Sequence, residues 1–250
     1  LYVIVVGIMK PSFLQLDNWM NLLRSVSVYG IISCGITFVM LTGRTDLSAG
    51  MMLTFLATIS CYFVTPGIEN QLLAIVVPIL LGAVGGLVNG ILVGVIRLNS
   101  FVSTLGMMSL YTGFVLLFIK QSPSLFGSQD MTVYRFLGQG SILGIPTPVI
   151  ILAIVAIVSS IVLRRTVYGA RIYAVGSNAS AARYSGISPA AIIVSVYTVS
   201  GLLTGLGAVV MCSRILSAQP KMGSGYEFTA LTAIVLGGLS IQDSKDRKSG

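Results

Sequence analysis

The chain has 250 residues, of which 55% are hydrophobic and only 9% are charged, whereas a soluble domain carries about 25% charged residues. The composition therefore excludes a soluble domain, and the long apolar runs indicate an all-α polytopic membrane protein. With no histidine and seven acidic residues, mostly in loops, the chain offers little support for a zinc enzyme, a serine hydrolase triad or an intramembrane proton relay.

The net charge of +8 does not indicate a nucleic-acid partner, because the basic residues form no stripe and aromatic stacking platforms are absent. Contacts of loop ends with the lipid bilayer explain the charge more simply.

Apolar runs in chain order predict eight membrane spans within one transmembrane domain, residues 1–250. The spans are expected at about residues 1–9, 22–43, 47–66, 71–96, 101–119, 147–163, 192–211 and 227–241. The first run lacks an initiator Met, and the last is short enough to be a half-helix and leads into a polar tail. We therefore expect a helical bundle that is truncated at both ends.

Two charged residues, Arg44 and Asp46, interrupt the apolar sequence between the second and third spans. The favoured interpretation is an ion pair at the membrane interface. The alternative is that Asp46 forms a gate or a contact with a transported substrate, because ionisable residues near spans often do so.

Glycines recur at helical spacing in two of the predicted spans. Residues 71–96 contain a face of Gly82, Gly85, Gly86, Gly90 and Gly94, and residues 192–211 contain the pair Gly201 and Gly205. Small residues at this spacing allow helices to pack closely in lipid, whereas a phosphate-binding loop would need a following Lys-Ser or Lys-Thr. We therefore expect packing faces.

The connection 164–191 contains four arginines and no acidic residue. Basic loops stay on the cytoplasmic side, so we place this segment there. Within it, Asn178 is suited to cap a short helix, Gly186 to end it and Pro189 to begin the next one. The segment is either a helix that a partner grips or a simple tether between two spans.

If the sides alternate from this loop, nine basic residues fall on the cytoplasmic side and six on the outer side. The cytoplasmic set is Arg44, Arg97, Arg164, Arg165, Arg171, Arg183, Lys245, Arg247 and Lys248. The outer set is Lys10, Arg24, Lys120, Arg135, Arg214 and Lys221. The bias is mild and in the direction that the positive-inside rule predicts.

Four segments, in the same order, resemble the ribose-type sugar permeases of ABC importers, a family that also includes branched-chain amino acid permeases. They are residues 42–50 (TGRTDLSAG, against TGGIDLSVG), 101–106 (FVSTLG, against FIVTLG), 175–187 (VGSNASAARYSGI, against GxNxEAARLSGI) and 213–238 (SRILSAQPKMGSGYEFTALTAIVLGG, against SRLGSAQPTAGTGYELDAIAAVVLGG). The similarity covers nearly the whole chain, and the last segment is the most specific.

The resemblance implies a type II ABC importer permease, a multi-pass protein of the bacterial plasma (inner) membrane that moves a monosaccharide such as ribose. It implies as partners an ABC ATPase subunit, a second permease copy or paralogue, and an extracytoplasmic sugar-binding protein. The chain would be no enzyme and hold no cofactor, with ATP and Mg²⁺ on the ATPase. By the same resemblance, the residues that contact the ATPase would be Asn178, Ala181, Ala182 and Gly186. The residues at the outer mouth of the pathway would be Gln219, Pro220, Tyr226 and Glu227, with Asp46 a further candidate for the pathway.

The sequence departs from the family pattern at several positions. An acidic residue of the coupling loop is Ser180, an aspartate is Thr229, and a Gly-Ile pair is replaced by Arg44 and Thr45. The glycine-rich turn expected after Ser240 is replaced by a charged tail.

Other functions stay open on the sequence alone. The same fold could import branched-chain amino acids or another small solute, or the chain could be a paralogue that does not transport. An ATP-independent secondary transporter ranks lower, because Asp46 and Glu227 are expected at span ends and such a transporter needs an ionisable residue near the midplane. A membrane-embedded enzyme ranks lower still.

Overall fold

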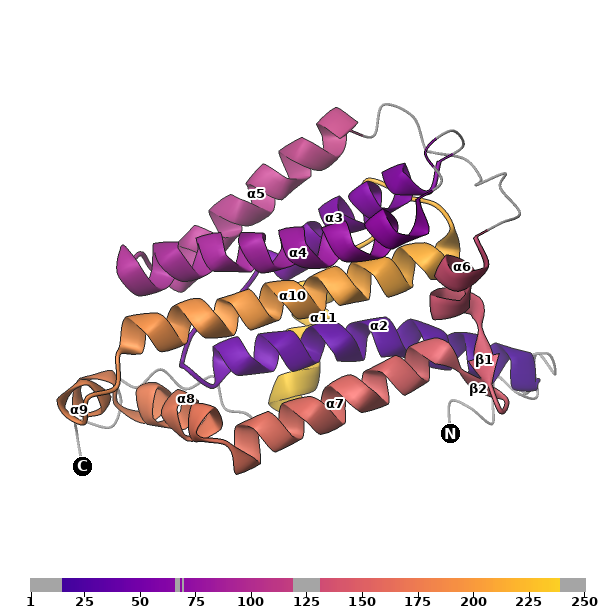
Figure 1. Cartoon of the computed structure of the whole chain (residues 1–250). Coiled ribbons are helices and arrows are strands. Elements are labelled where there is room, and N and C mark those ends of the chain that lie inside the picture. Colours follow the sequence, from indigo (N-terminus) through magenta and orange to yellow (C-terminus); the bar gives the residue numbers. More distant parts are fainter. Residues whose placement is uncertain (1–14, 66–67, 69, 119–130, 239–250) are drawn as a thin grey trace.

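The computed structural model describes residues 15–65, 68, 70–118 and 131–238, so the predicted span at residues 1–9 lies outside the described part. The elements are α2 (Leu16–Met40), α3 (Ala49–Phe63), α4 (Gln71–Gly90), the π-helical turn η2 (Ile91–Val95), α5 (Ser100–Phe118), α6 (Thr132–Gln139), β1 (Ser141–Ile142), β2 (Ile145–Pro146), α7 (Thr147–Arg165), α8 (Val167–Ser177), α9 (Ala179–Tyr184), α10 (Pro189–Ile215) and α11 (Tyr226–Leu236). The strands form a small antiparallel hairpin in which Ser141 pairs with Pro146. The long helices lie side by side in one bundle (Figure 1).

Five helices in the described part are long and apolar enough to cross a membrane: α2, the continuous α4–η2, α5, α7 and α10. They correspond to five of the predicted spans, with ends shifted by a few residues. Two other predicted spans, 47–66 and 227–241, are only the 15-residue α3 and the 11-residue α11. A span needs about 20 residues, so each of these two described helices is shorter than a full crossing.

The helix α10 is the centre of the bundle, because it packs against α2, α3 and α4. A Cβ atom at Gly82 would collide with the backbone of Gly201, and one at Gly86 would collide with the carbonyl oxygen of Tyr197. The same close approach of α4, η2 and α10 occurs at Gly90, Gly94, Gly201 and Gly205. The prediction that these glycines form packing faces is confirmed.

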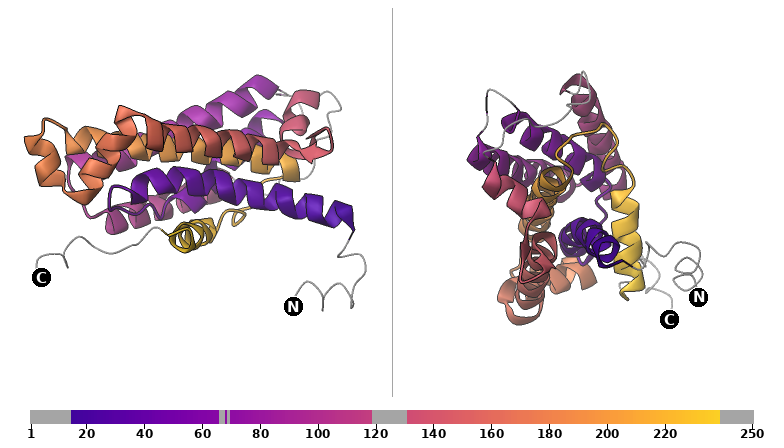
Figure 2. Two further views of the ribbon diagram at one scale, coloured as in Figure 1. Left: turned by 90° about the horizontal axis from the view of Figure 1, so that it is seen from below. Right: turned by 90° about the vertical axis from the view of Figure 1, so that its right-hand side faces the viewer.

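The helix α11 runs in a different direction from the rest. In both views of Figure 2 it lies across the bundle, beside α2. The ring of Tyr226 at its start stacks on Tyr29 of α2, with 4.0 Å between the ring centres. The segment that leads to it, residues 216–225, therefore turns from the end of α10 back toward the interior.

The two ends of the bundle carry different sets of arginines. One end holds α8, α9 and the α4–α5 connection, and Arg44, Arg97 and Arg183 line one cavity there. At the other end, Arg24 donates to the carbonyl of Gln139, whose side chain donates to the carbonyl of Arg214. Within the described part, the structure therefore separates the two predicted sets of basic residues.

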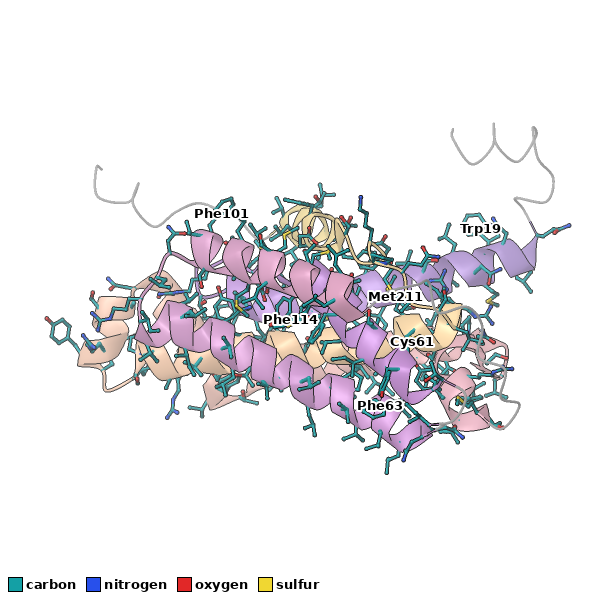
Figure 3. The ribbon with its side chains drawn as sticks, turned by 90° about the horizontal axis from the view of Figure 1, so that it is seen from above. Trp19, Cys61, Phe63, Phe101, Phe114 and Met211 are labelled. Carbon is teal, nitrogen blue, oxygen red and sulfur yellow. The ribbon has the colours of Figure 1, made fainter. Side chains whose placement is uncertain are left out.

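Apolar side chains fill the bundle in two clusters, one among α2, α3 and α10 and a smaller one beneath α8 and α9. Figure 3 shows Cys61 and Met211 in the first cluster, from α3 and α10, whereas Trp19 and Phe101 lie toward opposite ends of the molecule. Trp19 is 36% exposed, as expected for an aromatic residue at the membrane interface.

Candidate functional site

The connection between α2 and α3, residues 41–48, enters the bundle instead of staying at its end. Gly43 has a φ of +72°, a conformation that glycine adopts without strain, and it redirects the chain after α2. Beyond this turn, Asp46 and Ser48 are completely buried. We call residues 41–48 the re-entrant segment.

Asp46 is the centre of a buried hydrogen-bond network. Its Oδ1 accepts hydrogen bonds from the Ser48 backbone N–H at 3.0 Å and from the Ser48 hydroxyl at 2.7 Å. Its Oδ2 accepts from the Ser200 hydroxyl of α10 at 3.4 Å. The Asn89 amide of α4 donates to the Ser48 hydroxyl at 2.8 Å. The network therefore ties the start of α3 to two other helices.

Two further contacts hold the backbone of the re-entrant segment. The Tyr197 hydroxyl of α10 donates to the carbonyl oxygen of Thr45 at 2.7 Å. The N–H of Leu47 donates to Thr104 Oγ1 of α5 at 3.2 Å. Buried backbone groups must find such partners when they lie outside regular structure. The sequence alone did not predict roles for Tyr197 and Thr104. Each is a polar side chain inside an apolar run, and that feature could have indicated them.

The ion pair expected between Arg44 and Asp46 is wrong. Arg44 instead donates to the carbonyl of Thr42 at 3.1 Å, and no ion pair joins Arg44 to Asp46 among the described residues. Burial lowers the pKa of the Arg44 guanidinium from its ordinary value. The Asp46 carboxylate instead accepts a hydrogen bond from Ser200. Ser200 lies about 16 Å along α10 from its first residue, Pro189, at 1.5 Å per residue, so this contact is well inside the bundle.

The expectation that Asp46 and Glu227 lie at span ends is therefore also wrong. Glu227 is 1% exposed, and a Cβ on Gly50 in the first turn of α3 would collide with its carboxylate. Both acidic residues lie in the interior beside the start of α3, because the short helices α3 and α11 begin inside the bundle. Neither oxygen of Glu227 has a hydrogen-bond partner among the described residues.

The segment before α11 packs closely against α3. The N–H of Gly223 donates to Thr54 Oγ1 at 3.0 Å, and a Cβ on Gly223 would collide with the carbonyl of Gly50. Of the residues expected at the outer mouth, Gln219 is exposed and Pro220 is half-buried, whereas Tyr226 and Glu227 lie deeper, against α2 and α3. Their contact with a transported molecule stays a prediction.

The basic connection forms two helices, not one. Thr166 caps α8, which the sequence reasoning missed, and Asn178 caps α9 by accepting from the N–H of Ala181 at 3.0 Å. Gly186 has a φ of +79° and ends α9, and Pro189 begins α10. The predicted cap, stop and start are therefore confirmed.

Most of the exposed side chains of α9 are short, and they end in a methyl group or a hydroxyl. Ala181 is exposed, whereas Ala182 is 4% exposed and packs inward beside Ile172. Tyr184 is 93% exposed, which makes it the most prominent side chain on α9 and one that sequence reasoning did not single out. Asn178, Ala181 and Gly186 are exposed and therefore accessible to a partner, whereas Ala182 is buried and is not.

The described part of the chain contains no group of three or more His, Cys, Asp or Glu residues that could hold a metal ion. The polar groups around Asp46 bind one another, whereas both carboxylate oxygens of Glu227 are buried without a partner among the described residues. The network around Asp46 fixes the start of α3 against α4 and α10.

Comparisons with known proteins identify the family that shares this sequence. The family described as "Branched-chain amino acid transport system / permease component" matches residues 18–243. The ribose import permease protein RbsC of Escherichia coli is 38% identical over 248 residues, which cover 98% of this chain and 77% of that protein. The corresponding protein of Bacillus subtilis is 37% identical, covering 99% and 76%. The L-arabinose ABC transporter permease protein AraH of Azospirillum brasilense is 34% identical, covering 92% and 67%. No solved structure matches the chain.

Proposed function

The chain belongs to the permease family of ABC transport systems, and on that premise we propose that it forms the membrane pathway through which ribose enters the cell. As a member of this family it is a multi-pass permease of the bacterial plasma membrane and not itself an enzyme. ATP hydrolysis belongs to a separate subunit of such systems.

The observation that carries ribose as the cargo is the identity to ribose import permeases of two bacteria, which extends over nearly the whole chain. The arabinose permease is less similar and covers less of the chain. Branched-chain amino acids, which the family description names, are the alternative cargo.

The cytoplasmic partner is an ABC ATPase that docks on α9, with ATP and Mg²⁺ bound by that partner. The support is local geometry. Asn178 fixes the start of α9 and Gly186 fixes its end, so a rigid helix with the small residue Ala181 stands at the surface. A helix with short side chains can seat in a groove of another protein.

Movement of α9 would reach the interior through α10, which follows it directly. Tyr197 and Ser200 of α10 hold the re-entrant segment, and Asn89 connects the segment to α4. ATP-driven closure of the ATPase pair can therefore tilt α10 and shift the re-entrant segment together, which opens one side of the pathway and closes the other. Two permease copies, with a sugar-binding protein outside, complete this proposal.

Ribose uptake by cells tests the cargo. A bacterial strain without its own ribose importer, supplied with this permease and its associated ATPase and binding protein, should accumulate labelled ribose. Labelled leucine serves as the matched alternative cargo. Uptake of leucine without ribose would overturn the assignment of ribose and keep the family.

A further inference from the structure

A cavity of about 470 Å³ opens at the end of the bundle that carries α8 and α9. It lies between α9, the start of α10 and the turn that joins η2 to α5. Three of its lining residues are Arg44 of the re-entrant segment, Arg97 of the η2–α5 turn and Arg183 of α9. Segments far apart in the sequence thus bring three arginines to the lining of one cavity.

The positive charge of this cavity is not balanced by the described residues that line it. In the part of the chain that the structure describes, the lining contains no acidic side chain, and Pro189 and Ala190, in the first turn of the 27-residue α10, add the positive end of a helix dipole. Arg97 also has a φ of +65°, an unfavourable backbone conformation for a residue with a Cβ that is often found at ligand sites. The cavity is therefore built to receive an anion.

Part of the remaining wall of the cavity is apolar, and Ser180 and Tyr184 also line it. Leu98, which is 47% exposed, lines the apolar part together with Gly94 and the buried Val93 and Ile193. A free inorganic anion would leave this wall without a partner, whereas a molecule with an anionic head and a hydrocarbon part would fill both halves.

The position of the cavity indicates where such a molecule would come from. It lies at the end of helices that are long enough to span a bilayer, on the side where the basic residues place the cytoplasm. Anionic phospholipid headgroups of the cytoplasmic leaflet lie at this depth, and basic pockets between membrane helices bind them.

We propose that the cavity lined by Arg44, Arg97 and Arg183 binds the phosphate headgroup of an anionic phospholipid, with the start of its acyl chains against Val93, Leu98 and Ile193. The lipid links the re-entrant segment, the η2–α5 turn and α9. It therefore joins the proposed docking helix to the segment that holds Asp46.

The test compares lipid binding by the detergent-purified protein and by two double variants that lose the same charge. Arg97→Gln with Arg183→Gln changes the cavity. Arg165→Gln with Arg171→Gln is the matched control, because both residues are exposed at the same end of the bundle and neither lines the cavity. Native mass spectrometry counts bound phosphatidylglycerol against phosphatidylcholine with the same acyl chains.

We expect the unaltered protein and the control to retain phosphatidylglycerol preferentially. The cavity variant loses two arginines and should bind phosphatidylglycerol about 25-fold more weakly, because each arginine near an anionic headgroup contributes about fivefold. The single change Arg183→Gln, on an exposed side chain, should give about a fivefold loss without disturbing the Arg97 turn.

Three outcomes would overturn the proposal. Equal losses in the cavity variant and the control would show general attraction to basic loops. Displacement of the lipid by millimolar inorganic phosphate would assign the site to a free anion. Unchanged lipid binding, combined with loss of ATPase co-purification in the cavity variant, would assign the cavity to acidic side chains of that protein.

Discussion

Replacing Asp46 with alanine should destabilise the protein strongly, whereas replacing it with asparagine should not. Asp46 accepts two short hydrogen bonds from Ser48, at 3.0 and 2.7 Å, and a longer one from Ser200. Alanine leaves the two Ser48 donors without their acceptor in a fully buried site. An unsatisfied buried donor costs about 1–3 kcal/mol, so we expect a loss of about 2–6 kcal/mol in the free energy of unfolding.

Asparagine keeps an oxygen at the position of Oδ1, so both bonds from Ser48 survive. Its amide can donate to the Ser200 hydroxyl in place of the bond that Ser200 now donates. We therefore expect Asp46→Asn to cost less than about 1 kcal/mol.

Unfolding by a denaturing detergent in mixed micelles measures both variants against the unaltered protein, and ribose uptake provides a second readout. Equal destabilisation by alanine and asparagine would refute the hydrogen-bond account. A stable Asp46→Asn protein that has lost uptake would show that the carboxyl group acts on the cargo or the gate, not as a structural link.

Three further predictions test the other parts of the site. Ala181→Arg should abolish co-purification of the ATPase, whereas Ala170→Arg, at an alanine of α8 that is also exposed, should not; retention by both would exclude α9 as the docking helix. Gly86→Ala should cost about 1–3 kcal/mol of stability because its Cβ meets the backbone of α10, whereas Gly106→Ala on α5, which has open space, should be near neutral; equal stabilities would contradict the close packing. Asn178→Ala should destabilise α9 by about 1 kcal/mol, seen as faster amide hydrogen exchange confined to that helix, and unchanged exchange would refute the cap.

Local chemistry made several features predictable from the sequence. The glycine faces follow from helical spacing, because residues four apart lie on one side of a helix, and the cap at Asn178 and the stop at Gly186 depend only on neighbouring residues. The same local signals would have found α8, since Thr166 is a good cap. The family resemblance supplied the rest of the architecture.

The burial of Asp46 could not be read from its neighbours. The residues that hold the re-entrant segment, Tyr197 and Ser200, are 152 and 154 positions away from their partners Thr45 and Asp46. A charged residue next to a short polar break looks like an interfacial residue in sequence, and only the packing of α10 against α3 reveals that the segment turns inward. Likewise, α3 and α11 look like spans because their helices are apolar, although they begin inside the bundle.

Transport by purified components tests the central claim most directly. The permease, its ATPase and its binding protein are placed in sealed proteoliposomes, with labelled ribose and binding protein on one side and the ATPase with ATP and Mg²⁺ on the other. The account predicts ribose uptake that requires both ATP and the binding protein and that disappears with Ala181→Arg. Ribose uptake that continues without ATP or without the ATPase would contradict it.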